Sequence, residues 1–256
     1  MFVEIIFLLI LRSIPAEIKM QQPIYLNKIT DEGFAIIPRV ISNTAVNEIL
    51  NALDKIRLGG AARIRRGSVY AIRDLLNEVP FLRTLTQLVN LRALIEPILG
   101  PKAKIVRAIF FDKTKNANWK VTWHQDLTIA VQKRCDVDGF GPWSKKAGIV
   151  HVQPPVSILE KMLTLRIHLD DSTAENGALS VIARSHRRGR MSHNQIQALR
   201  QVTSSVLCPV PRGGIMVMQP LLLHASAAGV NPSHRRIVHF EYSASQLPGG
   251  LEWYDA

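Results

Sequence analysis

The feature that most constrains the fold is a change of hydrophobic period at Lys104. Before it, apolar residues recur at helical spacing, and after it come short runs rich in β-branched and aromatic residues. Met162–Asp171 alternates strictly, with leucine and isoleucine on one face and Thr164, Arg166 and His168 on the other. Such a strand is half-buried or lines a polar cavity. Helices followed by many short antiparallel strands favour an α+β, mainly β fold, a jelly roll with N-terminal helices packed outside the sheet.

The helical part is predicted from the residues that can begin and end helices. Ser42 or Asn43 offers an N-cap for a first helix, which Gly59 and Gly60 would stop. Pro80 can begin a second helix, and a further apolar segment ends at Gly100. Asp31–Pro38 reads as a turn followed by a short strand. The other predicted strands are Ile105–Phe111, Val121–Ala130, Met162–Asp171, Leu179–Ile182, Ile215–Met218, Leu221–His224 and Arg235–Tyr242.

These elements predict one domain over residues 20–256, with a helical part at about 40–100 and a jelly-roll core at about 104–245. Residues 1–19 are treated as an N-terminal extension, because Met20 offers an alternative start. The apolar run Phe2–Leu11 is too short to span a bilayer and lacks the basic start of a secretory signal. Residues 131–157 carry several glycines and prolines together with Phe140 and Trp143, so we expect a long loop that acts as a lid.

The composition narrows the classes of partner. The formal net charge is +12, which favours an anionic small molecule or surface. Basic residues are scattered and aromatics make up only 6%, so a nucleic-acid platform is not expected. Residues 61–68 read as an exposed basic loop, although Arg63, Arg65 and Arg66 could line an entrance for anions. Two cysteines give no disulfide framework, which fits a cytoplasmic protein without stable membrane insertion. The oligomeric state is not indicated.

The motif Trp123–Asp126 (WHQD) carries candidate metal ligands. On an extended strand His124 and Asp126 project to the same face, where they could supply two ligands of a 2-His-1-carboxylate Fe(II) site. His224 could supply the third, although a buried histidine bonded to a backbone carbonyl is the ordinary alternative. Turn formers follow it, so Arg235 or Arg236 on the next strand should return beside His224, where a guanidinium can clamp a dicarboxylate.

The chain resembles the phytanoyl-CoA dioxygenase family of Fe(II)- and 2-oxoglutarate-dependent oxygenases. The resemblance covers roughly residues 30 to 254 and rests on three stretches in order. They are WHQD at Trp123–Asp126, LRIHLDD with NGALSVIARSH at Leu165–His186, and GGIMVMQPLLLHAS with the later RR at Gly213–Arg236. It implies a double-stranded β-helix, or cupin-like, core. Two positions depart from the family pattern: Ala225 replaces a glycine, and Arg184 replaces the glycine of a Pro-Gly-Ser-His turn.

The same resemblance implies roles for individual residues. His124, Asp126 and His224 would bind iron, Arg235 would pair with the distal carboxylate of 2-oxoglutarate, and the Ser226 hydroxyl would bond the same carboxylate. Six further residues are candidates for supporting the site or contacting substrate: Gln125, Arg107, Thr164, Arg166, His168 and Trp143. The remaining histidines, His151, His186, His193, His234 and His239, show no ligand-like grouping.

The implied activity is hydroxylation of an unactivated C–H bond of a small organic substrate, with release of succinate and CO2. The net charge makes an anionic substrate attractive. The cofactors would be Fe(II), 2-oxoglutarate and O2, with ascorbate as a reductant. The alternative is a catalytically degenerate jelly-roll module that binds an anionic ligand or a membrane surface. The substrate itself is not indicated, because pockets of this kind are built from variable loops.

Overall fold

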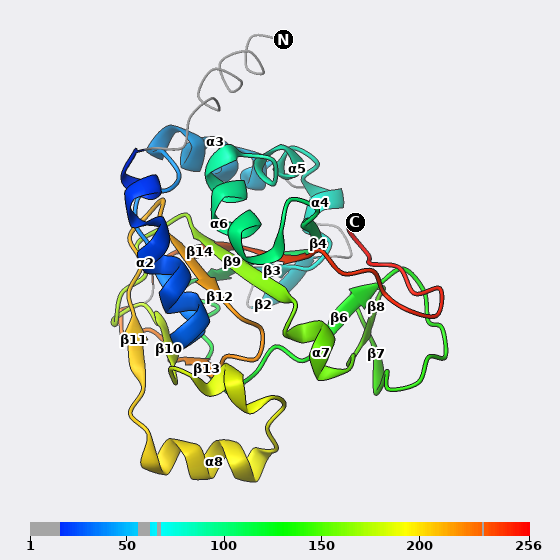
Figure 1. The fold of residues 1–256 in the computed structure, drawn as a ribbon. Coiled ribbons are helices and arrows are strands. Elements are labelled where there is room, and N and C mark those ends of the chain that lie inside the picture. The colour runs from blue at the N-terminus through cyan, green and yellow to red at the C-terminus, as the bar shows by residue number, and fades with distance from the viewer. Residues whose placement is uncertain (1–15, 56–61, 66–67, 232) are drawn as a thin grey trace.

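Two β-sheets facing each other, with helices on the outer face of the larger one, form the body of the protein (Figure 1). The computed structural model describes residues 16–55, 62–65, 68–231 and 233–256. A third, smaller sheet lies at one side. The expected α+β, mainly β jelly roll with helices outside the sheet is confirmed.

The helices gather mainly in the N-terminal part of the chain and cover one face of the large sheet (Figure 1). They are α2 (Ala16–Glu32), α3 (Asn43–Asp54), α4 (Leu75–Glu78), α5 (Leu82–Leu85), α6 (Val89–Leu99), α7 (Val156–Leu159), the 3-10 turn η1 (Ser185–Arg188) and α8 (His193–Val202).

The larger sheet has seven strands in the order β1-β12-β9-β14-β4-β3-β2. Its members, in chain order, are β1 (Phe34–Ile37), β2 (Ala62–Arg65), β3 (Ser68–Ile72), β4 (Lys104–Lys113), β9 (Met162–His168), β12 (Ile215–Met218) and β14 (Arg235–Ser243). The facing sheet has the order β11-β10-β13-β5 and comprises β5 (Val121–His124), β10 (Leu179–Val181), β11 (Val206–Cys208) and β13 (His224–Ser226). The third sheet comprises β6 (Ile129–Val131), β7 (Trp143–Lys146) and β8 (Ile149–Val152). All pairings between these strands are antiparallel.

The main hydrophobic core lies between the helices and the large sheet. The alternation predicted for Met162–Asp171 is confirmed, because Leu163, Leu165, Ile167 and Leu169 are all fully buried in this core. Helix α3 adds its buried stripe and begins at Ser42, whose hydroxyl accepts a hydrogen bond from the Ala45 amide. Each such aliphatic side chain contributes about 1.5–3 kcal/mol to folding when it leaves water.

The opposite face of the large sheet looks toward the smaller one. Between the two sheets, Phe34, Met216 and Met218 pack against Leu179 and Val181. This apolar contact fills only part of the space, and polar side chains of β4, β9 and β14 occupy the rest. The even positions of β9 are therefore buried rather than exposed. This face of the strand looks into the space between the two sheets and not into solvent.

Several local predictions were wrong. Residues 61–68 were expected to be a loop, but 62–65 and 68–72 form β2 and β3, which extend the large sheet beside β4. The alternating ARIR pattern at 62–65 is typical of a strand. Its high charge favoured an exposed loop instead, so the two-residue period was overlooked. The side chains of Arg63, Arg65 and Arg66 lie outside the described residues.

The helix expected from Pro80 is broken, since Pro80 precedes the four-residue α5 and a separate α6 starts only at Val89.

The predicted strand Leu221–His224 is also wrong in its first three residues, because β13 starts only at His224. Leu222 donates its amide hydrogen to Gln219 O in a turn, at 3.0 Å. The three successive leucines 221–223 enter three different hydrophobic clusters. A continuous apolar run does not distinguish a buried strand from a buried turn, which explains the error.

The segment 131–157 is not one long loop. It contains the hairpin of β7 and β8, and β8 also pairs with β6. Phe140 and Trp143 pack against the hydrophobic cluster of this third sheet.

Helix α8 was not predicted, although Ser192 and Gln195 form a reciprocal capping box at its start.

At the N-terminus, α2 runs from Ala16 through Met20 without a break. The apolar run Phe2–Leu11 lies outside the described residues. None of the described helices combines the length and apolar character needed to cross a bilayer.

Candidate metal centre and its cavity

The two candidate histidine ligands are cross-strand neighbours. In the antiparallel pair of β5 and β13, His124 lies directly opposite His224, and their ring centroids are 4.2 Å apart. Asp126 lies two residues beyond His124, after the strand has ended. Its amide donates a hydrogen bond to Pro220 O at 2.9 Å, which ties the extended chain to the turn before His224. The strand expected over Val121–Ala130 is thus interrupted at the motif.

The three side chains form a compact set of ligand atoms. Asp126 Oδ1 is 3.9 Å from His124 Nε2, and Asp126 Oδ2 is 3.8 Å from His224 Nε2. One ligand atom from each residue lies within 4.8 Å of the other two, so the group could hold a metal ion. Two imidazoles and one carboxylate match the donor set of non-haem Fe(II) sites with open positions.

Backbone hydrogen bonds prepare both histidines to act as ligands. His124 Nδ1 lies 2.8 Å from Thr122 O, and His224 Nδ1 lies 2.8 Å from Leu222 O. A carbonyl oxygen can only accept, so each Nδ1 carries the hydrogen and each Nε2 presents a lone pair toward Asp126. Burial lowers the pKa of His224 to about 4, against the raising effect of Asp126, so this imidazole is neutral near pH 7.

Asp126 is ionised. Burial acts to raise the pKa of its carboxyl group, but the surrounding His224, His239, His124 and Arg107 together hold it well below its ordinary value. The centre therefore offers one anionic oxygen ligand beside two imidazole nitrogens.

Gln125 supports the motif from behind. Its side-chain amide donates to Gly189 O at 2.8 Å and to Leu221 O at 2.7 Å, and its Oε1 accepts from the Met191 amide at 2.8 Å. It is buried and does not line the cavity. Gln125 thus connects the segment carrying His124 and Asp126 to the turn before His224, in keeping with its predicted supporting role.

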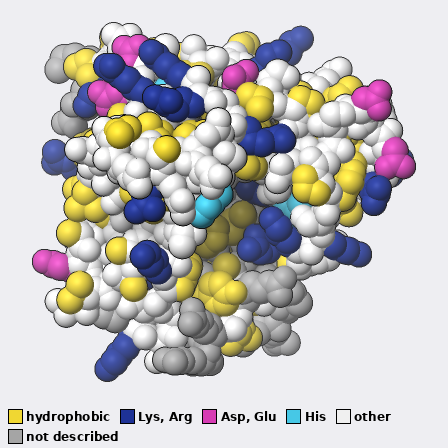
Figure 2. All heavy atoms as spheres, turned by 90° about the horizontal axis from the view of Figure 1, so that it is seen from below, with side chains coloured by type: hydrophobic (Ala, Val, Ile, Leu, Met, Phe, Trp, Pro, Cys, Tyr) yellow, Lys and Arg dark blue, Asp and Glu magenta, His cyan; other side chains and the backbone are white. Residues whose placement is uncertain are grey.

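A cavity of about 290 Å³ opens beside the three candidate ligands. Figure 2 shows the hollow, with histidine side chains at its rim and lysine and arginine side chains gathered beside it. The lining residues are Arg73, Arg107, Ile109, Phe111, Trp119, Val121, His124, Asp126, Thr128, Lys146, Arg166, Leu179, His224, Ser226, Arg235 and His239. Its volume lies near the lower end of the roughly 300–1,000 Å³ range of small-molecule sites.

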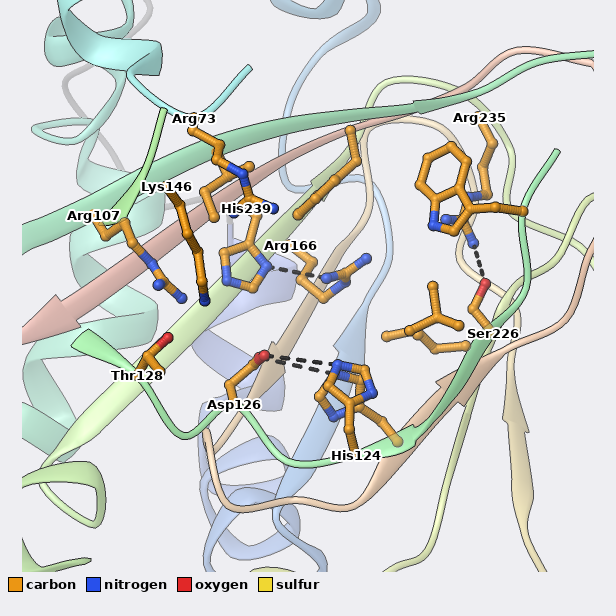
Figure 3. Close-up of a pocket in the computed structure, with 16 residues that line it drawn as sticks. Arg73, Arg107, His124, Asp126, Thr128, Lys146, Arg166, Ser226, Arg235 and His239 are labelled. Atoms are coloured by element: carbon orange, nitrogen blue, oxygen red, sulfur yellow. Dashed lines mark hydrogen bonds and ion pairs between the residues drawn. The ribbon is translucent and has the colours of Figure 1, made fainter. Parts of the chain in front are cut away.

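Arg235 and Ser226 lie together at one end of the cavity (Figure 3). Arg235 Nη1 donates to Gly177 O and lies 3.4 Å from the Ser226 hydroxyl oxygen, which in turn donates to Gly177 O at 3.0 Å. Arg236 does not line the cavity and instead makes two hydrogen bonds to Asp170, at 2.7 and 2.8 Å. Adjacent residues on a strand face opposite sides, so Arg235 is the one available to a ligand here.

Lys113, at the end of β4, lies at the same end of the cavity as Arg235 and Ser226. The sequence analysis did not identify it. Its ammonium donates to Ser226 Oγ and Ala227 O and lies 5.5 Å from the Trp119 ring centroid. Burial, followed by the charges of Arg235 and Arg166, lowers the pKa of Lys113 to about 7.

Arg107, Arg166 and His239 line the wall on the other side of Asp126 and are joined by hydrogen bonds that run through the buried Glu241. Arg166 Nη1 donates to His239 Nδ1 at 3.0 Å, and His239 Nε2 lies 3.1 Å from Glu241 Oε1. Arg107 Nη2 donates to the same Glu241 oxygen. Arg107, one of the candidates for supporting the site or contacting substrate, is buried and lines the cavity.

Three of the predicted candidates lie away from this cavity. Thr164 and His168 are fully buried, and among the described residues the Thr164 hydroxyl and both His168 nitrogens have no hydrogen-bond partner. Trp143 packs against the cluster of the third sheet, with Arg134 above its ring. None of the three lines the cavity.

Strand alternation would have found some of the missed residues. Lys113 has the parity of Arg107 on β4, and His239 has the parity of Arg235 on β14, so each pair shares a face. His239 was treated as an ordinary histidine because this alternation was not followed along the strand. Arg73 and Lys146 carry no such signal, since they lie after β3 and at the end of β7.

The Arg184 turn shows how the chain accommodates a departure from the family pattern. Arg184 keeps a left-handed backbone with φ of 67°, a conformation that favours glycine. Its amide donates to Glu32 O at 2.9 Å, which holds the turn against the end of α2. The backbone of this turn therefore retains the geometry that glycine would adopt without strain.

The fold and the grouping of two imidazoles with a carboxylate define the class of jelly-roll metal-dependent oxygenases. The sequence profile of the phytanoyl-CoA dioxygenase family matches residues 29–237. The chain belongs to this family and is an Fe(II)- and 2-oxoglutarate-dependent dioxygenase, an oxidoreductase. A search of curated proteins found no match.

Solved structures share the fold. AviO1 from Streptomyces viridochromogenes is 19% identical, with a TM-score of 0.65 over 89% of this chain and 97% of its own. EctD from S. alaskensis, solved with 2-oxoglutarate and 5-hydroxyectoine, is 16% identical, with a TM-score of 0.66 over 85% and 74% of the two chains. The epimerase SnoN, solved with Fe3+, alpha ketoglutarate and nogalamycin RO, is 17% identical, with a TM-score of 0.64 over 91% and 92%.

Proposed function

We propose that His124, Asp126 and His224 hold Fe(II) and that the enzyme hydroxylates an unactivated C–H bond of a small organic molecule. The observation that carries this proposal is the grouping of their three ligand atoms within 4.8 Å, beside a cavity that reaches Arg235. Bound Fe(II) would supply the centre at which dioxygen is activated.

The proposed reaction balances without an external reductant. A C–H bond of the substrate and the bond between C1 and C2 of 2-oxoglutarate are broken. One oxygen atom of O2 enters the new hydroxyl group and the other enters succinate, while C1 leaves as CO2. Two electrons come from the substrate carbon and two from 2-oxoglutarate, and together they reduce O2. Ascorbate would serve only to restore Fe(II) after turnovers without substrate.

Arg235 and Ser226 are assigned to the distal carboxylate of 2-oxoglutarate. Both line the cavity, and a guanidinium beside a hydroxyl supplies charge-assisted hydrogen bonds to a carboxylate. Lys113 adds a second cation to the same end. The chain's own contribution is thus to orient the co-substrate from its far end, which leaves its 2-oxo acid group toward the metal ligands.

The hairpin of β7 and β8 is assigned to covering the cavity within a single oxygenase domain over residues 20–256. Support comes from Lys146, which ends β7 and lines the cavity, while Trp143 at the other end of the strand packs into the third sheet. A hairpin anchored at one end and facing the site at the other is suited to exclude water from the reaction.

A non-catalytic module that binds an anionic ligand is the alternative. The basic lining of the cavity would serve it as well, but the arrangement of the candidate metal ligands would not. Both imidazoles have their Nδ1 hydrogens bonded to backbone carbonyls, so both Nε2 atoms point toward Asp126. This arrangement has no value for binding an anion and is the one that metal ligation needs.

The test is performed on metal-free protein reloaded with Fe(II). Without O2, addition of 2-oxoglutarate should produce a metal-to-ligand absorption band in the visible region. Under air and with ascorbate, slow release of succinate should follow. His224→Ala should abolish both signals because it removes a metal ligand, whereas His193→Ala, at an exposed histidine of α8, should change neither. Failure of the Fe(II)-loaded protein to bind 2-oxoglutarate would overturn the proposal.

A further inference from the structure

The cavity carries an excess of positive charge that the proposed cofactors do not neutralise. Among the described residues that line it, five are basic (Arg73, Arg107, Lys146, Arg166 and Arg235) and Asp126 is the one carboxylate. Glu241, buried behind the wall, pairs with Arg107. Fe(II) would add two positive charges and a 2-oxoglutarate dianion would remove two, so binding of both leaves the excess unchanged.

Three of these cations gather away from the proposed co-substrate end. Figure 3 shows Arg73, Arg107 and Lys146 on the side of Asp126 opposite to Ser226 and Arg235. They come from different parts of the chain: Arg73 follows β3, Arg107 lies on β4 and Lys146 ends β7. Thr128 lies on the same side and offers a hydroxyl group.

Arg107 lines this end of the cavity, and the protein fixes its position. It is only 7% exposed, and Glu241 engages its Nη2. Its buried Nε has no hydrogen-bond partner among the described residues. Glu241 thus fixes the position of the guanidinium group at the cavity wall, and its charge balances part of the positive charge there.

Lys146 faces the same space with like charges around it. Burial, followed by the positive charges of Arg107 and Arg73, lowers the pKa of its ammonium group, and the carboxylates of Asp126 and Glu241 oppose this shift only in part. The same three cations act on the buried His151. Burial, and then the charges of Arg107, Lys146 and Arg73, lower the pKa of His151 to about 4. Cations brought together in this way repel one another unless an anion lies between them.

We infer that the substrate carries an oxyanion group, a carboxylate or a phosphate ester, that binds between Arg107, Lys146 and Arg73. This inference rests on the proposed function, because it takes Arg235 to be occupied by 2-oxoglutarate. The anionic group would anchor one end of the molecule beside Arg107 and present a neighbouring C–H bond toward the metal ligands. A cavity of about 290 Å³, shared with the co-substrate, admits only a small molecule of this kind or the charged end of a larger one.

The test measures binding of two small probes, methyl phosphate and acetate, to protein loaded with Fe(II) and saturating 2-oxoglutarate without O2. Calorimetric titrations are run at constant ionic strength. Lys146→Met should weaken binding of the preferred probe at least about tenfold, because it removes one of three cations. Lys145→Met is the matched control: it removes the same charge from the neighbouring, exposed position of β7 and should change binding less than about twofold.

The probes separate the two sources of the anion, since tighter methyl phosphate binding indicates a phosphate ester and tighter acetate binding a carboxylate. Equal loss of binding in Lys145→Met and Lys146→Met, or no loss in either, would overturn the inference. So would a probe that displaces 2-oxoglutarate, because it would then occupy the Arg235 end. Arg73→Met takes the place of Lys146→Met if the latter is not stably folded.

Failure of this inference is distinguishable from failure of the proposed function. Binding of 2-oxoglutarate to the Fe(II)-loaded protein is measured separately, and Lys146→Met should leave its affinity unchanged. A protein that binds 2-oxoglutarate normally but ignores both probes retains the proposed function and loses only the anionic substrate.

Discussion

The two ends of the cavity are both basic, but their charges are held differently. At the Arg235 end the cations are bonded to the protein: Arg235 to Gly177 O, and Lys113 to Ser226 Oγ and Ala227 O. At the other end Arg107 is paired with Glu241, whereas Lys146 makes no hydrogen bond or ion pair among the described residues. An end already fixed by hydrogen bonds suits a constant co-substrate, whereas an end with unneutralised charge suits a molecule brought from outside.

The metal ligands between the two ends provide the largest expected effect. Asp126→Ala removes the anionic ligand and should weaken Fe(II) binding at least about 100-fold, more than typical losses of groups outside the ligand set. Anaerobic equilibrium dialysis measures the affinity. Asp136→Ala is the control, because its carboxylate is 88% exposed and it does not line the cavity. If Asp126→Ala bound Fe(II) like the unchanged protein, the two ends would not be organised around a metal.

The pair Arg235 and Arg236 tests the assignment of the co-substrate end. Arg235→Met should weaken 2-oxoglutarate binding about 100-fold through loss of charge-assisted hydrogen bonds, with Fe(II) affinity unchanged. Arg236→Met breaks the pair with Asp170 instead and should leave 2-oxoglutarate affinity nearly unchanged. Anaerobic titration of the Fe(II)-loaded variants measures both. The reverse order of effects would move the co-substrate away from Ser226.

Lys113 tests how far the co-substrate end depends on a bound anion. Burial lowers its pKa to about 7 in the folded protein, while the unfolded chain keeps the ordinary value near 10.4. The unfolded state therefore holds a proton that the folded state has released between these pH values, so stability should rise with pH across this window. Lys113→Met should remove this rise, which amounts to several kcal/mol because one pKa unit corresponds to about 1.4 kcal/mol; urea denaturation of the metal-free protein measures it.

Saturating 2-oxoglutarate gives this prediction a second readout. A dianion beside Lys113 favours the protonated ammonium group, against the effect of Arg235 and Arg166, and should reduce the rise of stability with pH. If the unchanged protein and Lys113→Met have the same pH profile, Lys113 does not contribute a buried charge to this end.

The smallest effect is expected outside both ends. Arg184→Gly relieves the left-handed strain at φ 67° and should raise the free energy of unfolding by about 0.5–1 kcal/mol. Arg188→Gly, at an exposed residue without positive φ in the same turn, should lower it by a similar amount. Chemical denaturation compares the two, and Fe(II) affinity should be unchanged in both. Destabilisation by Arg184→Gly would mean that the arginine side chain has a structural role.

Much of the site could be foreseen from residue type and spacing. The side chains of His124, Asp126 and His224 were expected to come together, and one ligand atom from each does lie within 4.8 Å of the other two. Arg235 or Arg236 was expected to return beside His224, and it is Arg235 that lines the cavity, 3.4 Å from the Ser226 hydroxyl oxygen. Lys113 and His239 follow from strand parity with Arg107 and Arg235. Thr164 and His168, in contrast, share the polar face of β9 with Arg166 but do not line the cavity. Alternation assigns a face of a strand and says nothing of which part of that face is open.

The sequence by itself determined the change from helical to β periodicity, the buried face of β9 and the candidate ligand set. These depend on local spacing, which the chain carries wherever it folds. Only the tertiary structure decided that His124 lies across from His224, that Arg235 rather than Arg236 faces the cavity, and that Arg73, Arg107 and Lys146 meet. Those facts depend on register and on contacts between segments far apart in the chain, where a shift of one residue reverses every side chain.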